Sequence, residues 1–203
     1  MVFKFFNNHI FLKLYSKSSE ISNWGNYPRI RSNISTIRSR EEISTLVNHF
    51  GKGIARGNGR CYGDALLAEN IFSTLNLKKL IHFDQGKGII KCESGVLLEN
   101  ILEVIMPRGW FLSVTPGTKY ITVGGAVASD VHGKNHHQEG SFCDYVIRIK
   151  ILCGDGRVYT CSKSENTELF LATCGGMGLT GIILEVEFKL KLIETAYIKQ
   201  IAE

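Results

Sequence analysis

The stretch Pro116-Gly117-Thr118-Lys119-Tyr120-Ile121-Thr122-Val123-Gly124-Gly125-Ala126-Val127-Ala128-Ser129-Asp130-Val131-His132-Gly133-Lys134-Asn135-His136-His137 says most about the site that this chain builds. A Pro-Gly turn leads into paired glycines and small residues, which predict the start of a helix, and three of the six histidines follow closely. Paired glycines at a helix start let backbone N–H groups approach an anion, and the helix dipole favours negative charge there. We therefore predict that this backbone forms one wall of a site for a phosphorylated ligand.

Length and composition are those of an ordinary globular chain. The 203 residues can bury a core in one domain or in two closely fused lobes. A net charge of +5 suits an anionic ligand or a weak membrane contact, but no basic stripe interleaved with aromatic residues supports nucleic-acid binding. The six cysteines include no Cys-x-x-Cys pair, which argues against a zinc finger or a redox motif and favours a reduced, cytoplasmic setting.

Residues 1–22 form a basic and apolar N-terminal arm in which no acidic residue precedes Glu20. Such a segment either settles at an anionic membrane surface or packs on the domain that follows, and both alternatives stay open. No run reaches the roughly 18 consecutive apolar residues that a membrane span requires. We therefore expect a cytoplasmic protein, with peripheral attachment to a membrane as the alternative.

Hydrophobic periodicity predicts a mixed α+β fold. Apolar residues at helical spacing follow Ser39 up to Phe50, recur at 98–105 before Pro107, and return at 167–172. The predicted strands are 53–55, 72–75, 80–83, 89–93, 110–114, 147–151 and 157–161. Helices and strands alternate without a regular βαβ rhythm, which favours α+β over a doubly wound sheet.

The cleanest alternation lies late in the chain. Five apolar residues alternate there with glutamates and lysines: Leu184, Val186, Phe188, Leu190 and Leu192. The pattern predicts one long strand in a sheet with a single buried face.

A glycine-rich loop, Arg56-Gly57-Asn58-Gly59-Arg60, follows a short predicted strand. Arginine side chains match phosphate oxygens with two parallel hydrogen bonds, and a glycine-rich turn presents several N–H donors to a pyrophosphate. The alternative is a surface turn with solvated arginines. The motif Gly176-x-Gly178-x-x-Gly181 has the letters of a dinucleotide fingerprint but precedes a strand, so we interpret it as a structural turn.

The cluster of Asp130, His132, His136 and His137 does not fix a metal-ligand geometry, and we expect no metal there. We predict instead that His132 and Lys134 orient a cofactor ring or an anionic substrate. A histidine that only satisfies hydrogen bonds in the core is the alternative. For Cys61, a reactive thiol beside Arg60 and a small packing residue both remain open.

On these residues the chain resembles the FAD-binding domain of the vanillyl-alcohol oxidase and p-cresol methylhydroxylase superfamily, the PCMH type. The matching segments are Trp24-Gly25, 55–64, 116–125, 132–137, 140–142 and 168–183. The block His132-Gly133-Lys134-Asn135-His136-His137 is the specific part, and it most resembles the oxidases that act on decaprenylphosphoryl-β-D-ribose.

This resemblance implies an extended FAD between two small α/β lobes, at 23–110 and 111–195. It assigns cofactor contacts to Ala55, Arg56, Gly57, Asn58, Gly59, Arg60, Cys61, Tyr62, Gly63, Gly117, Thr122, Val123, Gly124, Gly125, Ser129, Asp130, Val131, His132 and Ile183. Arg60 stands where other members carry the histidine that attaches flavin, so the FAD is expected to be non-covalent. Cys61 replaces a usual serine and Met177 a usual asparagine.

The resemblance also implies a function. The expected reaction is oxidation of a sugar C2 hydroxyl to a ketone, in a polyprenyl phospho-sugar during epimerisation of a cell-wall arabinan precursor, with Lys134 beside the phosphate. Residues 196–203 would begin a truncated connection to a substrate domain, which a partner chain would supply, and a reductase would complete the epimerisation. The alternatives are a sugar or alditol oxidase, or a non-catalytic FAD-binding subunit; no nucleic acid is expected as a partner.

Overall fold

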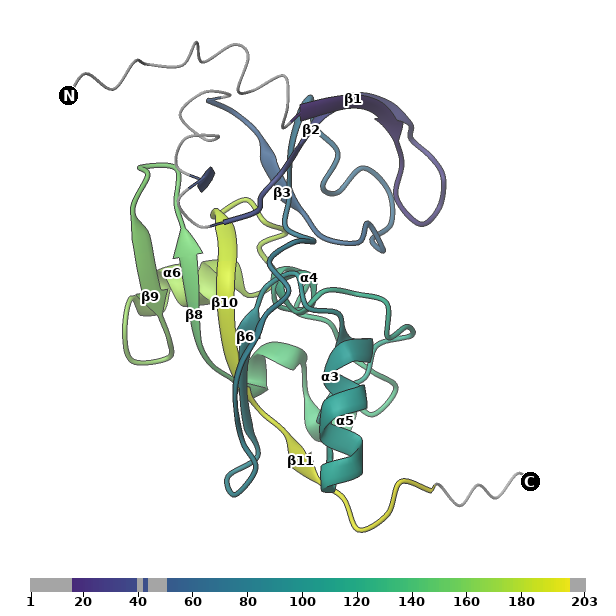
Figure 1. Cartoon of the computed structure of the whole chain (residues 1–203), viewed down its shortest axis with the longest axis vertical. Coiled ribbons are helices and arrows are strands. Elements are labelled where there is room, and N and C mark those ends of the chain that lie inside the picture. Colours follow the sequence, from purple (N-terminus) through teal and green to yellow (C-terminus); the bar gives the residue numbers. More distant parts are fainter. Residues whose placement is uncertain (1–15, 40–41, 44–50, 198–203) are drawn as a thin grey trace, which may run out of the picture.

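The computed structural model describes residues 16–39, 42–43 and 51–197 (Figure 1). These residues form a mixed α+β structure with a four-stranded sheet, a five-stranded sheet and a two-stranded ribbon. The α+β class is therefore the one that the sequence predicts. The predicted helix between Ser39 and Phe50 lies largely outside the described residues.

The four-stranded sheet has the order β1-β2-β4-β3. Its strands are β1 (Ser16–Ile21), β2 (Ile30–Thr36), β3 (Ile54–Arg56) and β4 (Asn70–Ser73). β1 pairs with β2 in antiparallel fashion, whereas β4 runs parallel to both β2 and β3. The last residues of the predicted N-terminal arm thus belong to a sheet, while its first 15 residues lie outside the described part of the chain.

The five-stranded sheet is antiparallel, with the order β5-β6-β10-β8-β9. Its strands are β5 (Leu80–Asp84), β6 (Ile89–Glu93), β8 (Val146–Leu152), β9 (Val158–Cys161) and β10 (Ile182–Lys189). Since β6 pairs with β10, the chain passes from one sheet to the other between Ser73 and Leu80. The β5–β6 hairpin belongs to the second sheet, and the predicted lobe boundary at 110/111 stays a prediction.

Three helices pack against one face of the five-stranded sheet: α3 (Leu98–Ile105), α4 (Val123–Ala128) and α6 (Thr167–Thr173). Leu98, Ile101 and Ile105 lie on the buried side of α3, as their spacing predicts. They join Val186 and Phe188 of β10 in the main core. Burial of each such apolar side chain contributes about 1.5–3 kcal/mol to the free energy of unfolding.

Smaller elements complete the fold. They are η1 (Met106–Arg108), β7 (Trp110–Phe111), α5 (His136–Glu139), η2 (Phe142–Tyr145) and β11 (Lys191–Leu192). Figure 1 shows β11 below the sheet, where it pairs with β7 in the separate ribbon. In the part of the chain that the structure describes, no helix is long and apolar enough to cross a membrane.

The predicted single long strand from Leu184 to Leu192 is wrong in two respects. The chain leaves the sheet after Lys189, and Leu192 in the ribbon is 68% exposed. The second error is that Leu184 does not share a face with Val186, because the pairing of β10 with β8 contains a bulge between Ile183 and Glu185.

The bulge changes which residues share a face of β10. Ile183 lies in the main core together with Val186, whereas Leu184 packs in a second core that includes Phe72 and Leu77. Glu185 is 3% exposed and lies 3.0 and 3.5 Å from the ammonium groups of two lysines, Lys91 and Lys150. Both faces of β10 are thus covered, since one extra residue reverses the alternation.

Candidate functional site

A pocket of about 40 Å³ lies where β3 and β4 meet α4 and β10. On the side of the four-stranded sheet it is lined by Ala55, Arg56, Gly57, Leu66 and Thr74. On the other side it is lined by Ser94, Thr122, Gly124, Gly125, Ala128, Gly178, Gly181 and Ile183. The structure therefore brings together three segments in which cofactor contacts were predicted, around Arg56, around Gly124 and at Ile183.

The glycine-rich loop beside this pocket offers a run of backbone donors. Within the described residues, none of the N–H groups from Gly57 to Gly63 donates to a protein acceptor. Other groups anchor the loop. The side chain of Asn58 donates to the carbonyl of Tyr120 at 2.8 Å, and the backbone carbonyl of Cys61 accepts from the backbone N–H of Trp24 at 3.1 Å. Successive free amides of this kind bind anions. The loop is thus equipped to hold a pyrophosphate.

The start of α4 does not provide the anion site that the sequence predicts. The N–H groups of Val123 and Gly124 donate to the carbonyls of Val96 and Ser94, each at 2.8 Å, and that of Gly125 donates to the Thr122 hydroxyl at 3.1 Å. These donors are therefore occupied inside the protein, and the free amides belong to the other glycine loop.

Gly124 of α4 and Gly57 of the glycine-rich loop have a steric role at this contact. A Cβ on Gly124 would lie 2.8 Å from the Cβ of Ser94, and a Cβ on Gly57 would lie 3.0 Å from Cγ2 of Thr122. Val123 and Val127 on the opposite side of α4 are fully buried in the main core. The glycines thus let the loop, the helix and the turn after β6 approach closely around the pocket.

Arg56 contributes its backbone to the pocket, but its guanidinium is engaged elsewhere. It donates to the side chain of Asn23 at 2.5 Å and to the carbonyl of Ser22 at 2.7 Å, and burial lowers its pKa. The expectation of two guanidinium groups for phosphate is therefore corrected to one. That one is Arg60, which is exposed and lies 5.0 Å from the centre of the Trp24 ring.

The structure shows the surroundings of Cys61 and the backbone conformation of Met177, the two residues that depart from the superfamily pattern. Cys61 is half-buried, its thiol donates to the carbonyl of Ala65 at 3.4 Å, and burial raises its pKa. This favours packing over reactivity. Met177 adopts a left-handed backbone with φ of +51°, a conformation that asparagine tolerates better than methionine.

The histidine block lies beyond α4, outside the pocket lining. Asp130 accepts from the hydroxyl of Ser141 and from the N–H of Cys143, both at 2.9 Å, so its carboxylate ties α4 to η2. His132 and Lys134 are exposed. No group of three or more potential metal ligands occurs in the ranges that the structure describes.

The remaining predicted contacts divide into two sets. Val123 is buried in the main core and is not among the residues that line the pocket. The others do not line the pocket: Asn58, Gly59, Arg60, Cys61, Tyr62, Gly63, Gly117, Ser129, Asp130, Val131 and His132. Those from Asn58 to Gly63 still lie on the loop with free amides.

Sequence reasoning missed six lining residues: Leu66, Thr74, Ser94, Ala128, Gly178 and Gly181. A signal existed for the two glycines, since their motif was recognised but interpreted as a purely structural turn. Gly181 does have that role, with φ of +150° and no room for a Cβ beside the Leu152 carbonyl, and it lines the pocket as well. No sequence signal marks Ser94.

Ser94 provides a test of whether the pocket suits a polar cofactor. Its hydroxyl oxygen is buried and has no hydrogen-bond partner among the described residues. A flavin dinucleotide carries many polar groups, so an unpartnered hydroxyl, adjacent free amides and a glycine-lined wall together fit such a ligand.

A family model described as an FAD binding domain matches residues 34–162, which is more than half of the chain. The chain is 35% identical over 190 residues to decaprenylphosphoryl-beta-D-ribose oxidase of Mycolicibacterium smegmatis, covering 89% of this chain and 41% of that protein. It is 24% identical over 191 residues to L-gulonolactone oxidase of Mus musculus, covering 89% and 43%, and 27% identical over 116 residues to Delta(24)-sterol reductase of Homo sapiens, covering 57% and 22%.

The chain spans about two fifths of the length of the two oxidases and a smaller share of the reductase. The matched family region contains β3 with its glycine-rich loop and the whole of α4. The chain belongs to the FAD binding domain family, and FAD is its cofactor.

Proposed function

We propose that this chain is the FAD-binding part of an oxidoreductase that converts a sugar C2 hydroxyl to a ketone, in a polyprenyl phospho-sugar related to decaprenylphosphoryl ribose. The observation that carries the proposal is the run of free amides from Gly57 to Gly63 beside the pocket. The similarity to the mycobacterial oxidase over 89% of this chain supports the substrate class.

In this proposal the loop amides and the exposed guanidinium of Arg60 hold the pyrophosphate without a covalent bond to flavin. Thr122, Gly125 and Ile183 line the wall against which the rest of the cofactor lies. When bound, FAD supplies the acceptor for the hydride that leaves the sugar carbon.

The exposed His132 and Lys134 would orient the substrate, with the ammonium group of Lys134 beside the sugar-linked phosphate. The partners in this proposal are the lipid-linked sugar, a chain or domain that covers the substrate, and a reductase that completes the epimerisation.

A second candidate is oxidation of a free sugar or sugar lactone. It is favoured by the similarity to L-gulonolactone oxidase, which covers 89% of this chain. The polyprenyl phospho-sugar remains the first candidate, because the identity to the mycobacterial oxidase is higher over the same share.

The first experiment is the visible absorbance spectrum of the purified chain, repeated on the supernatant after acid precipitation. We expect flavin absorbance that is released into the supernatant. A colourless chain that also fails to take up added FAD would contradict the proposal.

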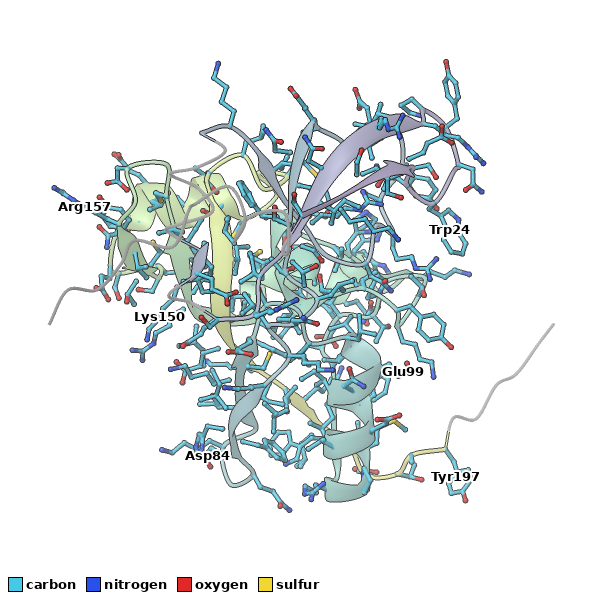
Figure 2. The ribbon with its side chains drawn as sticks, turned by 45° about the horizontal axis from the view of Figure 1, so that its top comes forward. Trp24, Asp84, Glu99, Lys150, Arg157 and Tyr197 are labelled. Atoms are coloured by element: carbon cyan, nitrogen blue, oxygen red, sulfur yellow. The ribbon has the colours of Figure 1, made fainter. Side chains whose placement is uncertain are left out.

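A pair of arginine variants tests the loop. Arg60→Ala should weaken FAD binding, because it removes the exposed guanidinium beside the free amides, whereas Arg157→Ala should not. Figure 2 shows Arg157 on the opposite side of the molecule from Trp24, on which Arg60 lies. Equal effects of the two substitutions would mean that the loop does not hold the pyrophosphate.

The substrate is tested by anaerobic bleaching of the flavin. Bleaching by a polyprenylphosphoryl ribose but not by L-gulonolactone is the expected result. The reverse preference would favour the second candidate. Bleaching by neither would refute oxidation by the isolated chain and leave it as a cofactor-binding subunit.

A further inference from the structure

We infer that Ser94 is a cofactor-binding residue, whose hydroxyl completes its hydrogen bonding only when part of FAD occupies the pocket. This inference rests on the proposed use of the pocket for FAD and adds a residue that neither the glycine motifs nor the superfamily resemblance indicates. Ser94 follows β6 directly and lines the pocket opposite Ala55 and Gly57.

The side chain of Ser94 is enclosed yet unsatisfied. The residue is 2% exposed, and its hydroxyl oxygen has no hydrogen-bond partner within the described residues. Buried hydroxyl groups almost always have a partner, because burial removes them from water without replacing its hydrogen bonds. An exception at the wall of a ligand pocket indicates that the partner belongs to the ligand.

The backbone around Ser94 cannot shift to give the hydroxyl another partner. The N–H of Ser94 donates to the carbonyl of Leu184 at 3.0 Å, and its carbonyl accepts from Gly124 at 2.8 Å. On one side, the Glu93 carboxylate accepts from the N–H of Lys79 at 2.8 Å. On the other, the N–H of Gly95 donates to Leu77 at 2.8 Å. The backbone that carries the hydroxyl is thus held between β10 and α4.

The close approach of α4 also explains why a serine fits this position. A Cβ on Gly124 would lie 2.8 Å from that of Ser94, so the wall has room for a small side chain only. Alanine would satisfy this steric demand without an unpartnered hydroxyl. The hydroxyl therefore has no role in the packing of the cofactor-free protein, and a role toward the cofactor remains.

The test compares Ser94→Ala with Ser32→Ala in the full chain. Ser32 is also buried, at 1% exposure, but its hydroxyl donates to the carbonyl of Ala68 at 2.7 Å, and it does not line the pocket. Two quantities are measured: the dissociation constant of FAD, by titrating the apoprotein and following flavin fluorescence, and the melting temperature without FAD.

For Ser94→Ala we expect about 3- to 10-fold weaker FAD binding, because one neutral hydrogen bond to the cofactor is lost. The melting temperature of the apoprotein should be unchanged or higher. For Ser32→Ala we expect the opposite pattern, a lower melting temperature and unchanged FAD affinity.

The outcomes separate this inference from the proposed function. If the wild-type chain does not bind FAD, the proposed function itself fails. If the wild-type chain binds FAD and Ser94→Ala binds it equally well, the role of Ser94 is overturned while the proposed function stands. A lower melting temperature of Ser94→Ala without FAD would also overturn it, because the hydroxyl would then have a partner in the apoprotein.

Discussion

The contact between the glycine-rich loop and α4 leads to a quantitative prediction for Gly57→Ala. The new Cβ would lie 3.0 Å from Cγ2 and 3.2 Å from Cβ of Thr122, and still closer to its hydroxyl oxygen. That hydroxyl is the N-cap of α4, where it accepts from the N–H of Gly125 at 3.1 Å. Since Thr122 is 2% exposed, its side chain must rotate away from the cap to admit the methyl group.

The cost follows from the cap that is lost. Removal of a threonine N-cap lowers the free energy of unfolding by about 1 kcal/mol, so Gly57→Ala and Thr122→Ala should each cost about that amount. In the double variant the cap is lost only once, and the crowding oxygen and methyl group are gone. We therefore expect a total near 1 kcal/mol instead of about 2, a coupling of about 1 kcal/mol between the two sites.

Urea unfolding of the four proteins without FAD measures this coupling. Gly154→Ala is the matched control, because nothing lies within 4 Å of the added Cβ. It should change the free energy of unfolding by less than about 0.5 kcal/mol or stabilise slightly. Additive effects of Gly57→Ala and Thr122→Ala, within about 0.5 kcal/mol, would refute the argument that the loop packs on the cap of α4.

Three further predictions concern sulfur-containing residues. Burial raises the pKa of Cys92 from 9.0 to about 12, so its contribution to stability is full below pH 9 and is lost as pH rises toward 12. Between pH 9 and 10.5 the free energy of unfolding should fall with pH more steeply for the wild type than for Cys92→Ala. The two slopes should differ by about 1.4 kcal/mol per pH unit, and equal slopes would contradict the burial argument. A hydrogen bond from Cys143 lowers the pKa of Cys174, so Cys174 should be alkylated fastest among the six cysteines near neutral pH, and Cys143→Ala should slow that reaction in a mass-spectrometric time course. Met177→Asn should raise the free energy of unfolding by up to about 1 kcal/mol, measured by urea unfolding, because asparagine tolerates the left-handed backbone. A lower free energy of unfolding would mean that the contact between the Met177 sulfur and the Ser129 hydroxyl outweighs the strain.

Local features of this protein are predictable from its sequence because they depend on neighbouring residues. The helix α3 lies where the apolar spacing predicts it, and it ends at Ile105, just before Pro107. The β8–β9 hairpin turns at Asp155-Gly156, where glycine adopts a φ of +78°. The glycine-rich loop after β3 is recognisable for the same reason, since its conformations depend on glycines within the loop.

Properties that depend on distant partners were predictable only in part. Both arginines of the loop look equally available in the sequence, but Asn23 and Ser22, more than 30 positions earlier, engage the guanidinium of Arg56. The amides at the start of α4 look free, but the carbonyls of Val96 and Ser94 accept from them. The alternation in β10 is regular in the sequence, yet the bulge at Leu184 appears only in its pairing with β8.

The sequence by itself determined the α+β class, the glycine loops and the kind of ligand they suit, because backbone freedom, periodicity and residue chemistry are local properties. The tertiary structure decided which donors remain for the ligand, since a hydrogen-bonding group is available only if no distant residue has already paired with it. Ser94 shows the difference most clearly: its letter is ordinary in the sequence, and its unpartnered hydroxyl exists only because β10 and α4 enclose it.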